Sequence, residues 1–93
     1  LDPTTEAYEQ LGWAEFRLGD YEASLESYKI AVDCDQTNWR ALNGIGVNTL
    51  NNWLLGDKTD TNSYQTARTV FRRSLALNPD QPKVITLILR YGL

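Results

Sequence analysis

The sequence contains an internal repeat, and this repeat constrains its fold more than any other feature. Residues 7–12 (AYEQLG) match residues 41–46 (ALNGIG) at an offset of 34, with small, large and Gly positions in register. Residues 21–32 match residues 64–75 in the same way, at an offset of 43. Periods of this length are typical of stacked structural units, so the chain is predicted to consist of repeats.

The offset grows by nine residues between the two comparisons, so the second copy contains an insertion of nine residues. Residues 56–63 (GDKTDTNS) have the polar composition of a loop, with Gly and Asn present. We therefore place a loop insertion near residues 54–63. Long loops are often functional, but a mobile surface excursion explains the composition equally well.

Each half of the repeated unit has the periodicity of a helix. Apolar or small residues recur at positions 21, 24, 25, 28, 31 and 32, which is the spacing of one buried helical stripe. The preceding segment shows the same spacing in Tyr8, Leu11, Gly12 and Leu18. Between the two segments, Gly19 is suited to end one helix and Asp20 to cap the next. Each unit is thus predicted to be a helix hairpin.

The ends of the units divide the chain into segments. Pro79 lacks an amide proton and forces Asn78 away from helical angles, so a helix must end there. Residues 1–3 (LDP) repeat this ending, and the chain begins without Met, so we expect a piece of a longer or processed protein. The expected segments are the end of a preceding repeat (1–4), repeat 1 (5–38), repeat 2 (39–81) and the first helix of a third or capping repeat (82–93).

These features resemble the tetratricopeptide repeat, a 34-residue helix hairpin. The positions that carry the resemblance are Tyr8, Leu11, Gly12, Tyr21, Tyr28 and Ala31 in the first copy, and Ile45, Gly46, Ala67, Phe71 and Pro79 in the second. Ser24 departs from the pattern where Ala is usual, and Gln36 where Pro is usual. The resemblance implies an all-α fold of about five helices, arranged as a helix-hairpin solenoid with a right-handed superhelix.

Residues 82–93 have more apolar positions than one helix face can bury. The β-branched residues among them leave an isolated strand as an alternative to a helix. We favour a helix because the segment follows Pro82 in the register of the repeat. Its surplus apolar surface is a candidate for self-association.

The composition argues against catalysis. The chain has no histidine, which is the commonest general acid, base and zinc ligand. Cys34 is the only cysteine, and because it lies between Asp33 and Asp35 we interpret it as structural or inert. Residues 57–62 carry oxygen ligands but lack the central Gly and final Glu of a calcium-binding loop. We therefore expect no enzyme activity, no cofactor and no metal.

Nucleic acid and membrane partners are not expected either. The isoelectric point near 4.7 disfavours nucleic acid, and we interpret Arg68, Arg72 and Arg73 as a solvated helix face. The sequence has no apolar run of about 20 residues and no signal peptide, so we expect no membrane insertion and a cytoplasmic location, with a periplasmic one left open.

The charges are distributed unevenly along the chain. Residues 1–38 carry a net charge of −7, whereas residues 39–93 carry +4. This asymmetry would allow copies to stack acidic end to basic end, although solvated helix faces are the preferred explanation.

The resemblance also implies where a partner would bind, because first helices of successive hairpins line a concave groove in this family. The corresponding face here carries Glu9, Trp13, Phe16 and Arg17, then Asn43, Val47, Leu50 and Asn51, with Arg40 at the same offset, and finally Arg90. Trp13 is the type of residue found at binding hot spots, and packing against a preceding repeat is an equal alternative for it. For Phe16 we favour packing.

Family members that hold the C-terminal carboxylate of chaperones have Lys and Asn where this chain has Glu9 and Trp13. A chaperone tail is therefore not expected. We predict a non-catalytic protein–protein interaction module that binds a partner peptide or protein in the groove. The alternative is a structural spacer or self-assembly unit.

Overall fold

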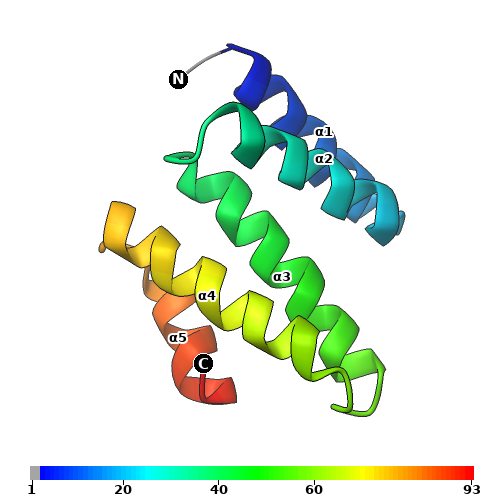
Figure 1. Ribbon diagram of the computed structural model, residues 1–93, viewed down its shortest axis with the longest axis vertical. Coiled ribbons are helices and arrows are strands. Elements are labelled where there is room, and N and C mark those ends of the chain that lie inside the picture. The colour runs from blue at the N-terminus through cyan, green and yellow to red at the C-terminus, as the bar shows by residue number, and fades with distance from the viewer. Residues whose placement is uncertain (1–2) are drawn as a thin grey trace.

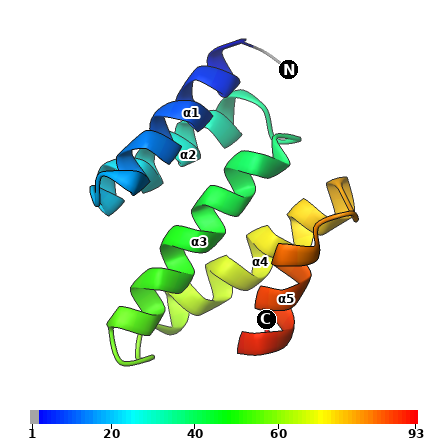
Figure 2. The same cartoon turned by 180° about the vertical axis from the view of Figure 1, so that it is seen from behind.

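The computed structural model describes residues 3–93, which form five α-helices. These are α1 (Pro3–Arg17), α2 (Tyr21–Cys34), α3 (Trp39–Leu55), α4 (Thr61–Leu77) and α5 (Pro82–Tyr91). The first four helices form two hairpins, and α5 packs against the second of them (Figure 1). The view from behind brings α1, α3 and α5 to the front, so the helices form two layers, with α2 and α4 in the other layer (Figure 2).

The predicted all-α fold with about five helices is confirmed. The alternative of a C-terminal strand is wrong, because residues 82–91 are helical. Residues 1 and 2, assigned above to the end of a preceding repeat, lie outside the described residues. Pro3 and Thr4, assigned with them, are instead the first residues of α1. A proline is well suited to this position, since the first amide of a helix has no partner within the helix.

Side chains in the connecting segments start three of the helices. Asp20, Asn38 and Asp60 precede α2, α3 and α4, and each accepts a hydrogen bond from the backbone amide three residues later, at 3.3, 3.1 and 3.1 Å. Such caps satisfy one of the unpaired amides at a helix start. Gly19 has a φ of +82°, the left-handed conformation predicted to end α1.

The core contains two clusters, and each is built around an aromatic ring seated on a glycine. The first contains Tyr28, Ala31, Ala41, Leu42, Ile45 and Val70; the second contains Leu50, Ala67, Phe71, Val84 and Leu93. A Cβ at Gly12 would lie 3.0 Å from the Tyr28 ring, and a Cβ at Gly46 only 2.6 Å from the Phe71 ring. In both hairpins, an aromatic ring of the second helix therefore packs against a glycine of the first helix, at equivalent positions of the repeat.

The prediction of a buried stripe on the first helix is only partly correct. Leu11 and Leu18 are 47% and 85% exposed, and Tyr21 at the start of α2 is 44% exposed. Gly12 is buried as predicted, Tyr8 is half-buried against the first cluster, and Thr5, which was not predicted, is buried as well. The physical reason is that α1 lies at the edge of the array, so only one of its faces meets a neighbouring helix.

The nine inserted residues are mostly helical rather than the loop expected near 54–63. α3 extends four residues past the point where the repeat register would end it, and α4 begins three residues early. The connection between them is only two residues longer than that of the first hairpin. α3 continues because Trp53 and Leu54 pack against the second core cluster, and α4 starts early because Asp60 caps it.

Candidate functional site

A groove lies between α1 and α3. It has a volume of about 300 Å³ and is lined by Trp13, Phe16, Tyr28, Arg40, Asn43, Gly44 and Val47. A second hollow of about 360 Å³ adjoins it and is lined by Glu9, Gln10, Trp13, Tyr28 and Arg40. Because the two hollows share three residues, we describe them together as the α1–α3 groove. Tyr28 of α2 forms its floor.

Five of the nine residues proposed from the sequence line this groove: Glu9, Trp13, Phe16, Asn43 and Val47. Arg17 does not line it, but its guanidinium lies 4.8 Å from the centre of the Trp13 ring at the rim. Asn51 and Arg90 do not line it either. The assignment of Leu50 is wrong, because this residue is 5% exposed and lies in the second core cluster, on the side of α3 that faces α4.

Sequence reasoning missed three residues of the groove, Gln10, Tyr28 and Gly44. Tyr28 was assigned to the repeat signature alone, although its ring separates α1 from α3. The ring fits there because neither Gly12 nor Gly44 has a side chain, and a Cβ at Gly44 would overlap it. The signal available in the sequence was a pair of glycines inside helices, where glycine costs up to ~1 kcal/mol and needs a packing reason.

The polar groups of the groove are unevenly paired. Oε1 of Glu9 is shielded from solvent and receives no hydrogen bond from the part of the chain that the structure describes. The two cationic side chains beside the groove stack on indole rings: Arg17 on Trp13, and Arg40 on Trp39 at 4.4 Å. Burial raises the pKa of the Tyr28 hydroxyl to about 12, and the charge of Glu9 adds to this shift. Tyr28 therefore stays neutral.

The orientation of the Asn43 amide follows from a chain of hydrogen bonds. Nε2 of Gln81 donates to the carbonyl and hydroxyl oxygens of Ser74 and to the carbonyl of Asn78, at 2.8–3.1 Å. Gln81 must then present Oε1 to Asn43, whose Nδ2 donates to it at 2.7 Å. This leaves Oδ1 of Asn43 as a buried acceptor without a partner.

Comparison with known proteins adds the family. A family model described as the tetratricopeptide repeat matches residues 5–38. Residues 5–38 are thus a tetratricopeptide repeat. A search of curated proteins gives no match. Tetratricopeptide repeats generally mediate protein–protein interactions and are generally non-catalytic.

The tetratricopeptide repeat at residues 5–38 contains one departure that the structure explains. Ser24, where Ala is usual, is fully buried between the helices. Its hydroxyl donates to the carbonyl of Gly12 at 2.7 Å and accepts from Nδ2 of Asn48 at 3.0 Å. Ser24 thus joins α1, α2 and α3 by hydrogen bonds that an alanine could not make.

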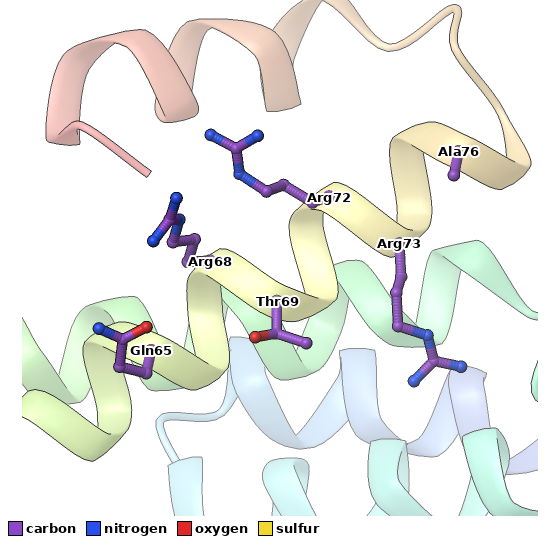
Figure 3. A pocket seen from close by; sticks show the side chains of 6 residues that line it. All are labelled: Gln65, Arg68, Thr69, Arg72, Arg73 and Ala76. Atoms are coloured by element: carbon purple, nitrogen blue, oxygen red, sulfur yellow. The ribbon is translucent and has the colours of Figure 1, made fainter.

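A larger hollow lies on the outer surface of α4. It has a volume of about 480 Å³ and is lined by Gln65, Arg68, Thr69, Arg72, Arg73 and Ala76. Arg68 and Arg72 extend toward α5, whereas Arg73 points the opposite way (Figure 3). Nε of Arg72 is already bonded to the carbonyl of Leu93 at 2.8 Å. Because the three guanidinium groups diverge, they do not form a shared anion site.

Two searches of the described residues, 3–93, complete the description. No helix in this range is long and apolar enough to cross a membrane. No three side chains of His, Cys, Asp or Glu in the same range lie together as a metal ion would require.

Proposed function

We propose that this protein is a non-catalytic interaction module that binds a peptide segment of a partner protein in the α1–α3 groove. The observation that carries the proposal is Trp13, an indole that is 56% exposed at the rim of a hollow already shaped between two helices. Exposed tryptophan costs free energy in water and is enriched at binding hot spots, where it fills or covers pockets.

The size of the groove supports a peptide rather than a large rigid ligand. The two hollows of the groove have volumes of about 300 and 360 Å³, at the lower end of the range for small-molecule sites, so each has room for one or two side chains. Phe16 and Val47 provide apolar contacts, while Asn43 and Glu9 provide polar ones. The single thiol of Cys34, which is exposed and free, suits a reducing compartment, and we propose the cytoplasm on this ground.

The test is selection from a displayed library of random peptides against the wild-type protein, followed by binding measurements with two variants. Trp13→Ala removes the indole at the rim of the groove, and Leu77→Ala is a matched control that truncates a 43% exposed residue on α4. We expect the selected peptides to lose about tenfold or more in affinity for Trp13→Ala, as hot-spot truncation does, and to bind Leu77→Ala normally. Equal losses in both variants, or none in either, would rule out the groove.

A second candidate function is self-assembly through α5. Ile85 and Leu89 are 42% and 78% exposed on the outer face of this helix. Sedimentation at increasing protein concentration tests this candidate. A dimer that Leu89→Glu abolishes would support it, and a monomer at all concentrations would exclude it.

A further inference from the structure

We infer that the partner segment is basic, with a Lys or Arg side chain that enters the α1–α3 groove and pairs with Glu9. This inference rests on the proposed function and adds the chemistry of the ligand. It follows from the polar groups of the groove. Glu9 and Asn43 each have a buried acceptor without a hydrogen bond, and the arginines beside the groove stack on indole rings.

Glu9 provides the anionic part of this site. One of its carboxylate oxygens is shielded from solvent, and no donor within residues 3–93 reaches that oxygen. Shielding a carboxylate oxygen without a partner costs free energy, because the lost hydrogen bonds to water are not replaced. Glu9 also lines the groove, so a cationic side chain that enters it would bring hydrogen-bond donors and the opposite charge to this carboxylate.

Asn43 provides a second acceptor, and the surrounding structure does not allow it to become a donor. Its Nδ2 is held by Gln81, whose own Nε2 is held by three acceptors. Rotating the Asn43 amide would therefore place two oxygens against each other. Because Asn43 lines the groove and its Oδ1 is also unpaired, the polar groups on this side favour a ligand that donates hydrogen bonds over one that accepts them.

Among residues 3–93, neither Arg17 nor Arg40 forms an ion pair with Glu9. The guanidinium groups of Arg17 and Arg40 lie over indole rings at 4.8 and 4.4 Å. On a longer scale, residues 1–38 carry a net charge of −7. A field of this sign attracts a basic peptide and increases its association rate at low salt.

The experiment uses three peptides that differ only in one central residue. Each has the form acetyl-Gly-Ser-Leu-Xaa-Leu-Ser-Gly-amide, with arginine, norleucine or glutamate as Xaa, and binding is followed by nuclear magnetic resonance titration of the wild-type protein. We expect the arginine peptide to bind about tenfold more tightly than the glutamate peptide, which is the effect of a single well-placed charge. Shifts should be centred on Glu9, Trp13 and Asn43.

Variants then test whether Glu9 is the residue that recognises the charge of the peptide. Glu9→Gln should remove the preference for arginine, whereas Asp33→Asn, the same charge change at an exposed site on α2, should leave it intact. Arg40→Gln should strengthen binding of the arginine peptide, because it removes a like charge from the lining of the groove. A groove built for an acidic ligand would show the opposite sign in both Glu9→Gln and Arg40→Gln. Circular dichroism checks that each variant remains helical.

The outcomes separate this inference from the proposed function. If Trp13→Ala weakens all three peptides equally and wild type shows no charge preference, peptide binding in the groove stands and the basic ligand is overturned. If the arginine peptide fails to bind wild type, or Asp33→Asn acts like Glu9→Gln, the basic ligand is likewise overturned. If the peptides bind but Trp13→Ala weakens none of them, the groove itself is wrong.

Discussion

Gly46 is a residue at which the absence of a side chain matters for stability. The Phe71 ring lies so close that an added Cβ would come within 2.6 Å of it, and Phe71 is fully buried with no room to withdraw. We therefore expect Gly46→Ala to lower the free energy of unfolding by about 1–3 kcal/mol, the usual cost of overpacking, despite the better helix propensity of alanine. Urea denaturation followed by circular dichroism measures this change.

Two further variants check the reason for that loss. At Gly12 the corresponding contact with Tyr28 is 3.0 Å, so Gly12→Ala should cost less than Gly46→Ala. In the double variant Gly46→Ala, Phe71→Leu, the smaller side chain makes room for the methyl group and should recover part of the stability. If Phe71→Leu makes Gly46→Ala worse, the steric explanation fails.

At the level of single residues, the sequence predicted the packing roles better than the polar ones. The large and small positions of the repeat identified Tyr28, Phe71 and their glycines, since volume patterns repeat with the fold. Asn38 and Gln81 were not identified as buried polar residues, although Asn38 is buried just before α3 and Gln81 just before α5. Their roles depend on hydrogen bonds to residues far along the chain, such as that from Nδ2 of Asn38 to the hydroxyl of Thr5 at 3.0 Å, and no local pattern encodes these.

Among the elements, the second hairpin differs from the first in length. Its inserted residues extend both helices and end in a tight connection in which Asp57 and Lys58 have φ values of +57° and +61°. Non-glycine residues in this left-handed region cost about 1–2 kcal/mol each. The Trp53 and Tyr64 rings, 4.8 Å apart, and Lys58 over the Trp53 ring at 5.7 Å stabilise the strained tip. Polar composition alone predicted a longer loop because it does not show how far apolar packing extends a helix.

The carboxyl groups at the ends of helices make the free energy of unfolding depend on pH in the acidic range. The Ser63 hydroxyl, and then its amide, hold the pKa of Asp60 below its usual range by hydrogen bonding, and Thr37 does the same for Asp35. A carboxyl group with a lowered pKa in the folded state stabilises the fold above its unfolded pKa, near about 4. That contribution is lost as the pH falls through the lower folded pKa.

Thermal unfolding between neutral pH and strong acid tests this dependence. The variant Asp60→Asn keeps the capping oxygen but does not titrate, so its melting temperature should fall less than that of the wild type as the pH drops below about 4. Asp80→Asn, a change at an exposed acid outside a cap, should follow the wild-type curve. Parallel curves for wild type and Asp60→Asn would contradict the role of the cap.

In the molecule as a whole, α5 is the element held by the fewest interactions. Val84 is the only buried residue of α5, and the C-terminal end is attached by hydrogen bonds from the Tyr64 hydroxyl to the carbonyl of Gly92 at 2.7 Å and from Nε of Arg72 to the carbonyl of Leu93 at 2.8 Å. We expect Tyr64→Phe to speed amide hydrogen exchange in α5 while leaving exchange in α1 and α2 unchanged, because elements with little burial open locally. Tyr21→Phe, on the exposed start of α2, provides the matched control.

If Tyr64→Phe instead speeds exchange equally in all helices, α5 opens only with the rest of the molecule and the prediction fails.

The order of the helices and their pairing were predictable from the repeat, since each hairpin is a local structure. The shape of the groove was less predictable, because it depends on the approach of α1 and α3 around Tyr28 and on the unpaired state of Glu9.

The unequal lengths of the two hairpins also matter for how the chain reaches its native state. Repeat proteins are prone to misassembly, in which one unit takes the place of its neighbour or of a unit in another copy. Here such an exchange would set a short hairpin where a long one belongs, so Trp53 and Leu54 would lose their burial against the second core cluster. The length mismatch thus discriminates between correct and swapped pairings, and it favours a single refolded species even where the repeats are otherwise alike.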